Sequence, residues 1–207
     1  WATPLYFRAL DFGVDLSVQA ATKYIGGHSD IMFGTISANA AALPALNAAG
    51  KDLGQCAGPD DVFLALRGLR TMAVRLAHHQ AAGIAIAKWL RDHPAVERVL
   101  HPALEDDPGH AIWKRDFTGA SGLFSVILKP VPQQAVDTFL DALRLFGMGF
   151  SWGGFESVVI PFDCSSYRTA TRWSPAGPAL RFHIGLENID DLRADLAQAF
   201  DALARAS

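Results

Sequence analysis

The chain has 207 residues, of which 50% are hydrophobic and 19% are charged, so it can bury a core and is expected to fold rather than stay disordered. Its formal net charge of -3 gives no electrostatic basis for nucleic acid or an anionic membrane as a partner. Two cysteines, Cys56 and Cys164, are too few for a disulfide framework, and no zinc-ligand spacing surrounds them. No apolar run is long enough to span a bilayer and no signal peptide is visible, so we expect a soluble, cytoplasmic protein.

A single lysine follows the first predicted strand. Residues 14–20 alternate between apolar and polar side chains with a period of two, as a half-buried strand does. Gly26 and Gly27 allow the chain to turn sharply just past Lys23, so we expect this lysine at a strand end, facing a cleft. A lysine with a lowered pKa in such a place can form a Schiff base with a carbonyl compound. The ordinary alternative is a solvated lysine at a strand terminus.

A strand, a short helix and a long helix are predicted next. Residues 31–37 predict a strand, and residues 40–49 predict a helix with Pro44 in its first turn or at a bend. Asp60 is the expected N-cap of the longest helix, which should run to about Leu90. Its apolar stripe is expected to consist of Val62, Leu66, Leu69, Ala73, Leu76, Gly83, Ala87 and Leu90.

Gly68 lies inside this helical pattern and weakens it, and we place a domain boundary there. The rest of the chain again mixes strands and helices. Strands are expected over residues 96–100, 123–128 and 158–160 and through Leu180, Phe182 and Ile184. Helix faces are expected at Val136, Phe139, Leu140 and Leu143, and at Leu192, Leu196, Phe200 and Leu203. Such alternation predicts an α/β protein.

Two further segments carry groups that suit a small ligand. In residues 150–157, glycines after Ser151 and Trp152 let backbone donors approach a ligand, although a plain glycine turn is the simpler interpretation. Arg181 alternates with apolar residues on a strand, and its planar fork suits a carboxylate. The alternative for Arg181 is a structural ion pair, with Glu187 as a partner.

Three histidines are less informative. His183 shares the strand face of Arg181, but nothing beyond this supports metal ligation or acid-base work. His78 and His79 are neighbours in the long helix and cannot both face one site, so we expect surface or interface positions.

Three motifs together resemble one family. Residues 19–30 resemble the cofactor-lysine segment of the pyridoxal-phosphate enzymes of the transsulfuration group, which act in cysteine and methionine metabolism. Residues 150–157 resemble the family's serine-leucine-glycine-glycine motif, with Trp152 in place of leucine. Residues 180–187 resemble its arginine motif. The motifs stand in the family's order and spacing, and the similarity extends from Trp1 to about Leu203.

The resemblance implies a fold-type-I pyridoxal-phosphate transferase-like α/β fold. Residues 1–69 would be the C-terminal part of the large cofactor domain, and residues 70–207 the small C-terminal domain, entered by the long helix. In the family a tryptophan similar to Trp1 follows the aspartate that pairs with the pyridine nitrogen, so the chain is expected to be the C-terminal portion of a longer enzyme.

The resemblance also implies roles for individual residues. Lys23 would carry pyridoxal 5'-phosphate and Thr22 would bind its phosphate, although a strand-end threonine is the alternative. Ser151 and Trp152 would lie beside the substrate and the lysine, and Arg181 would bind the substrate's α-carboxylate.

One position departs from most of the family. Many relatives have a serine three residues before the lysine, where this chain has Ala20, so a serine-phosphate contact cannot be carried over. Both Ala20 and Trp152 are typical of the cystathionine β-lyase subgroup. Glu156 is expected to support its loop rather than to transfer protons.

The implied activity is a carbon-sulfur β-lyase that cleaves cystathionine to homocysteine, pyruvate and ammonia in methionine biosynthesis. The substrate would be a small amino acid, and the implied assembly is a homotetramer. A γ-synthase or γ-lyase of the same family is the nearest alternative. A non-catalytic fragment is another, because the family's upstream aspartate, ring-stacking tyrosine and phosphate loop are absent from these residues.

Overall fold

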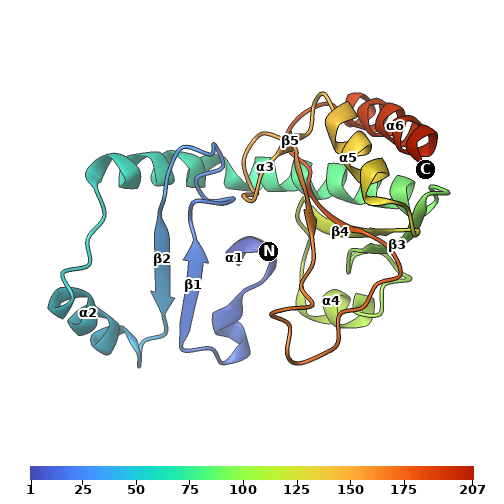
Figure 1. Ribbon diagram of the computed structural model, residues 1–207. Helices are drawn as coiled ribbons and strands as arrows, with labels where there is room; N and C mark the ends of the chain where they lie inside the picture. The colour runs from blue at the N-terminus through green and yellow to red at the C-terminus, as the bar shows by residue number, and fades with distance from the viewer.

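The computed structural model describes residues 1–207 and contains two sheets bridged by one long helix (Figure 1). In chain order the elements are α1 (Thr3–Tyr6), the 3-10 helix η1 (Ala9–Phe12), β1 (Leu16–Ala20), β2 (Gly34–Ala38), α2 (Leu43–Asp52), α3 (Pro59–Arg91), β3 (Val96–Leu100), α4 (His110–Asp116), β4 (Leu123–Leu128), α5 (Gln133–Ala142), β5 (Gly147–Met148), β6 (Val158–Phe162), β7 (Ala179–His183) and α6 (Ile189–Ala206). None of the helices combines the length and the hydropathy needed to cross a membrane.

The smaller sheet consists of β1 and β2, which pair antiparallel with Val18 opposite Ile36. The first strand is present, but it begins at Leu16 rather than at residue 14, and its apolar residues Leu16 and Val18 are exposed; the second strand begins at Gly34 rather than at residue 31. The reason is that Phe33 closes the preceding turn by bonding Thr22 instead of a strand partner. Helix α2 has Pro44 in its first turn, as expected.

Helix α3 begins one residue before the expected N-cap. Gly58 is the N-cap and Pro59 takes the first helical position, so the prediction of Asp60 as the cap was wrong. Proline suits this position because its φ is already helical and its missing N–H costs no intrahelical bond. Asp60 and Asp61 lie in the first turn, where the helix dipole favours negative charge.

The predicted apolar stripe of α3 is correct only in the second half of the helix. Leu76, Gly83, Ala87 and Leu90 are buried, whereas Val62, Leu66 and Leu69 are between 44% and 47% exposed. In the first half the buried face carries Ala65, Gly68 and Met72 instead. The cause is a close approach of backbone to backbone, because a Cβ on Gly68 would overlap the carbonyl oxygens of Ile25 and Gly26. Gly68 therefore does not interrupt the helix but lets the lysine turn lie against it.

The larger sheet has the order β3-β4-β7-β6-β5, antiparallel except for the parallel pair β5–β6. Strand β7 is central, with Arg181 opposite Ser125 on β4 and Ile160 on β6. The main core lies between this sheet and helices α3, α5 and α6 (Figure 1). The predicted inward residues of α6 are all buried: Leu192, Leu196, Phe200 and Leu203.

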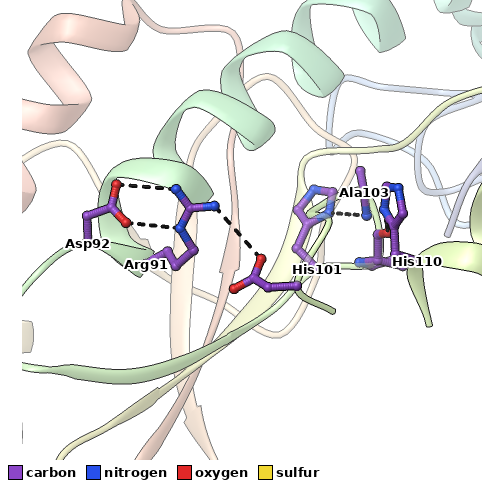
Figure 2. A network of polar contacts seen from close by, with 7 residues as sticks. Arg91, Asp92, His101, Ala103 and His110 are labelled. Atoms are coloured by element: carbon purple, nitrogen blue, oxygen red, sulfur yellow. Dashed lines mark hydrogen bonds and ion pairs between the residues drawn. The ribbon is translucent and has the colours of Figure 1, made fainter. Parts of the chain in front are cut away.

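The end of α3 is tied to the segment that follows β3 (Figure 2). Arg91 pairs with Asp92 at 2.9 Å and reaches Asp106 at 3.8 Å, while the fully buried His101 accepts the N–H of Ala103 through Nδ1. Exposed ion pairs contribute little to stability. The hydrogen bond of the buried His101 to the backbone of Ala103 therefore contributes more to holding this segment in place. Helix α4, in this region, was not predicted.

Candidate active site

Lys23 lies at the meeting point of three segments that are distant in the sequence. Its Nζ donates a hydrogen bond of 2.8 Å to Ser151 Oγ and lies 4.3 Å from the ring centroid of Trp152. Arg181 Cζ lies 5.3 Å from the centroid of the same ring. The structure thus brings together four of the five residues singled out in the sequence.

The turn that carries the lysine is held by its own backbone. Gly26 N donates to Ala21 O, and Gly27 N donates to Lys23 O at 2.8 Å. Gly27 has a φ of +73°, which only glycine adopts without strain, as the glycine pair predicted. Tyr24 and Ala21 are buried on either side, so Lys23 projects from a rigid support at the end of β1.

The surroundings of Lys23 make its amine easier to deprotonate than that of a solvated lysine. Partial burial and the nearby positive charge of Arg181 both lower the pKa of the lysine below its usual value. A neutral amine can act as a nucleophile or a base, which a protonated lysine cannot. The position is therefore chemically different from that of a solvated surface lysine.

Arg181 has no carboxylate partner within the chain. One of its Nη atoms donates to Phe150 O at 2.7 Å, and Leu180 and Phe182 on either side are buried in the core, as the alternation predicted. The alternative ion pair with Glu187 does not form, because Glu187 accepts from the N–H and hydroxyl of Ser157 instead. The remaining guanidinium N–H groups can bind a carboxylate of another molecule.

The loop with Ser151 and Trp152 packs directly on the lysine turn. Gly153 has a φ of +81°, and a Cβ there would lie 2.6 Å from Tyr24 N and 2.8 Å from the carbonyl carbon of Lys23. Ser29 also donates to Glu156 Oε2 at 2.8 Å, which agrees with a supporting role for Glu156. Backbone fit thus sets how Ser151 and Trp152 stand relative to Lys23.

Thr22 is the one singled-out residue whose side chain does not reach this group. Its hydroxyl accepts from Phe33 N at 2.9 Å and donates to Phe33 O at 3.2 Å. These are the bonds of a strand-end threonine.

The family comparison agrees with this geometry. Residues 1–201 match the model of the family described as Cys/Met metabolism PLP-dependent enzyme. The chain belongs to this family. Pyridoxal phosphate (PLP) is thus the cofactor of the proteins to which the chain is related.

Individual relatives are similar over nearly the whole chain. A putative cystathionine beta-lyase of Rhizobium johnstonii is 51% identical over 98% of this chain and 52% of its own length. Cystathionine beta-lyase MetC of Escherichia coli is 46% identical over 97% of this chain and 52% of its own length. The chain spans about half the length of these curated relatives.

A solved structure confirms the type of fold. Cystathionine gamma synthase from Xanthomonas oryzae, in complex with cystathionine, matches with a TM-score of 0.89 at 36% identity, over 99% of this chain and 54% of that one. The mixed α/β fold is therefore the one found in the C-terminal portion of fold-type-I PLP enzymes.

The residues of this PLP-family chain fit the cofactor's reactive group. A cavity of about 70 Å³ reaches Lys23 and is lined by Trp1, Thr3, Gln19, Ala20, Lys23, Tyr24, Ile25 and Trp152. PLP presents an aldehyde, and an amine with a lowered pKa at such a cavity is the group that can bind a carbonyl carbon.

Two buried residues near the site were misjudged or missed. The expectation that His79 lies at the surface or an interface was wrong: its side chain is fully buried and its Nδ1 is 2.8 Å from Ile184 O. The signal was available, because His79 stands three residues after Leu76 and four before Gly83 on the correct half of the stripe.

Arg75 was not considered in the sequence, and it is also buried. Its guanidinium lies over Gly27, donates to Gly68 O at 2.7 Å and contacts Ile25 O at 3.4 Å. It therefore fastens helix α3 to the lysine turn. No hydrophobic pattern could have indicated this contact, since its acceptors are backbone carbonyls.

Proposed function

We propose that this chain supplies the lysine side and the substrate side of a PLP-dependent carbon-sulfur β-lyase. The substrate would be cystathionine, cleaved with one water to homocysteine, pyruvate and ammonia, as a step of methionine biosynthesis. The observation that carries the proposal is the convergence of Lys23, Ser151, Trp152 and Arg181 at one place. Two relatives named as cystathionine β-lyases, at 46% and 51% identity, support β-elimination.

Lys23 is the central group of the proposed reaction. Its Nζ would hold the cofactor at rest and take the proton from the substrate's Cα, for which a neutral amine is required. PLP, when bound, supplies an electron sink that stabilises the negative charge left on Cα. Ser151 Oγ, which accepts the hydrogen bond from Nζ, orients the amine between these tasks.

Arg181 and Trp152 would hold the substrate and shape its surroundings. The guanidinium of Arg181 would bind the α-carboxylate through its free N–H groups and thereby fix the direction of the Cα–H bond. The ring of Trp152 lies 4.3 Å from Lys23 Nζ and 5.3 Å from Arg181 Cζ, so it would cover both side chains on one side and restrict the access of water to them.

Thr22 can take the predicted phosphate contact without losing its structural role. Phe33 O accepts from both the N–H and the hydroxyl of Thr22. The hydroxyl proton could turn to a phosphate oxygen while Phe33 O keeps the backbone N–H and Thr22 Oγ1 keeps the N–H of Phe33. We therefore retain Thr22 as a phosphate ligand of the proposed site.

The domain division follows the same proposal. Residues 1–69 would belong to the large cofactor domain and residues 70–207 to the small domain, with α3 crossing the boundary as one continuous helix (Figure 1). The cofactor's ring and much of its phosphate would be held by the part of the enzyme that relatives have in addition. Assembly as a homotetramer and a cytoplasmic location remain predictions.

A product assay tests the reaction class. With cystathionine as substrate, the holoenzyme that contains this chain is expected to release pyruvate and homocysteine. Release of 2-oxobutyrate and cysteine would instead assign γ-elimination, the alternative raised by the match to a γ-synthase structure. Absence of cleavage together with no absorption band after addition of PLP would overturn the proposal altogether.

A further inference from the structure

Two histidines are buried between the lysine turn and strand β7, and the proposed roles use neither. His79 comes from α3 and His183 from β7, and their side chains are 0% and 1% exposed. Their ring centroids lie 5.1 Å apart, and the ring of Tyr24 stands edge-on to both, at 5.3 Å and 5.8 Å. This cluster lies directly behind the residues that present Lys23.

Backbone partners determine which ring nitrogen of each histidine carries the proton. His79 Nδ1 lies 2.8 Å from Ile184 O, which only accepts, so Nδ1 must be protonated. Gly153 N donates to His183 Nε2 at 3.1 Å, and this bond assigns the proton of a neutral His183 to Nδ1, which is buried and has no partner in the structure. Gly154 O, at 3.2 Å from the same Nε2, is then a contact without a hydrogen.

Strand β7 is hydrogen-bonded to both ends of residues 150–153, the segment that contains Ser151 and Trp152. Arg181 and His183 project from the same face of the strand, two residues apart. Arg181 donates to Phe150 O, and His183 accepts from Gly153 N. The two residues between these bonded positions are Ser151 and Trp152.

The His183 bond matters for Lys23 because of where Gly153 lies. Its backbone is in contact with that of Lys23 and Tyr24 and leaves no room for a side chain. A shift of Gly153 away from His183 therefore moves Trp152 and Ser151 relative to Lys23 Nζ, which now lies 4.3 Å from the Trp152 centroid and 2.8 Å from Ser151 Oγ.

We propose that His183 is a positioning residue for the lyase reaction, which it serves by accepting the N–H of Gly153 and so docking Ser151 and Trp152 on the lysine turn. This inference rests on the proposed function, and it assigns His183 no part in proton transfer. Burial, with the nearby ring of His79 and the charge of Arg181 as further causes, holds the pKa of His183 at about 3, so the ring stays a neutral acceptor at ordinary pH.

The test compares two substitutions of His183 with a matched control. His183→Met removes the acceptor but fills similar space, whereas His183→Gln can place an amide oxygen near Gly153 N. The control is His101→Leu, since His101 is also fully buried, also accepts a backbone N–H, from Ala103, and also has its pKa lowered to about 4. It lies after β3 (Figure 2), and although its ring packs edge-on against that of Trp1, with 6.1 Å between the centroids, it has no hydrogen bond to Lys23, Ser151, Trp152 or Arg181.

Hydrogen exchange of residues 150–154 in the substrate-free holoenzyme is the direct readout. His183→Met should speed exchange at Gly153 at least tenfold and lower kcat/KM for cystathionine about 10- to 100-fold. His183→Gln should recover most of both, and His101→Leu should change neither. Should His183→Met fail to fold, His183→Asn, which keeps an amide but is too short for Gly153 N, takes its place.

Three results would overturn the proposal. The first is unchanged exchange at residues 150–154 in His183→Met. The second is an equal defect in His183→Gln and His183→Met, which would mean that His183 acts only through its packing. The third is the same change in exchange and kinetics in His101→Leu. Because exchange does not depend on turnover, a protein that cleaves no cystathionine but shows the expected exchange pattern would refute the proposed function and leave the docking bond established.

Discussion

The two halves of helix α3 are held in different ways. In the second half, Leu76, Ile86 and Leu90 are completely buried in apolar contacts. In the first half, Val62 and Leu69 are largely exposed, and the contact to the lysine turn is made by Gly68 and the guanidinium of Arg75. The second half of α3, here called the sheet side, is thus stabilised by buried apolar surface. The first half, here called the lysine side, is stabilised by the close fit of two backbones and a few hydrogen bonds.

This difference predicts different sensitivities. Apolar packing spreads its free energy over many atoms, so single changes on the sheet side should lower stability more than they alter the site. The lysine side depends on contacts that one methyl group or one proton can abolish. Substitutions and pH changes can therefore separate the two regions experimentally.

The largest expected effect on the lysine side is that of Lys23→Ala. The variant should lose the absorption band of bound PLP and more than about 10³-fold of the elimination rate, since no other group would take the Cα proton. Its unfolding midpoint should barely change, because the side chain is partly exposed. Absorption spectroscopy, a pyruvate assay and urea unfolding measure the three quantities.

Lys51→Ala is the control for this substitution. Lys51 is exposed in the last turn of α2, and its removal should affect neither the spectrum nor the rate. Wild-type activity in Lys23→Ala would remove the lysine from the site.

Acidification should destabilise both regions through buried neutral histidines. Burial lowers the pKa of His79 and His101 to about 4 and that of His183 to about 3, whereas in the unfolded chain these groups titrate near 6.5. Between these values the unfolded chain binds more protons, so stability falls as pH falls through this window, by about 2 kcal/mol per histidine from pH 7 to pH 5. Urea unfolding at both pH values measures the loss.

The histidines can then be assigned to the two regions. His101→Leu should reduce the pH dependence of stability by the contribution of one histidine on the sheet side. His183→Gln should reduce it by the contribution of one histidine at the site. If stability were the same at pH 5 and pH 7, the three rings would not be neutral and buried in the way that their contacts require.

Arg181→Lys should weaken substrate binding although the charge is kept. A lysine cannot bond Phe150 O and bind a carboxylate bidentately at the same time. We expect kcat/KM to fall about 100-fold, chiefly through a higher KM, with little change in the spectrum of bound PLP, and steady-state kinetics separate these effects. Arg168→Lys is a control, since Arg168 is exposed and bonds only Thr171 and the ring of Trp173. Unchanged KM in Arg181→Lys would exclude the carboxylate contact.

The apolar side of the fold could be predicted well from the sequence. Strands β3 and β4 have the predicted bounds, and the inward residues of α6 are those that the helical spacing indicated. Periodicity reports burial against other side chains, and this is how the sheet side is packed. The short elements β5 and α4 carry too few apolar residues for such a signal.

The site could be predicted only in part. Family motifs located Lys23, Ser151, Trp152 and Arg181, which the structure brings together. Contacts of side chains with backbone, such as those of Arg75 and His183, leave no periodic trace. The same is true of Gly68, which matters because it has no side chain and so lets the backbone of the lysine turn approach the helix.

The smallest expected effects are those of two glycine substitutions, Gly50→Ala in α2 and Gly68→Ala on the lysine side of α3. In a helix interior alanine is favoured over glycine by about 1 kcal/mol, and Gly50 in α2 has open space around it, so Gly50→Ala should raise stability by about that amount. Gly68→Ala gains the same propensity, but its Cβ would overlap the carbonyls of Ile25 and Gly26, which belong to backbone and cannot rotate away. We expect a net loss of about 1–3 kcal/mol and a lower elimination rate, because relief of the overlap must shift the turn that holds Lys23. Urea unfolding and the pyruvate assay on both variants decide the matter: equal stabilisation by the two alanines, with full activity, would mean that α3 does not support the lysine turn through Gly68.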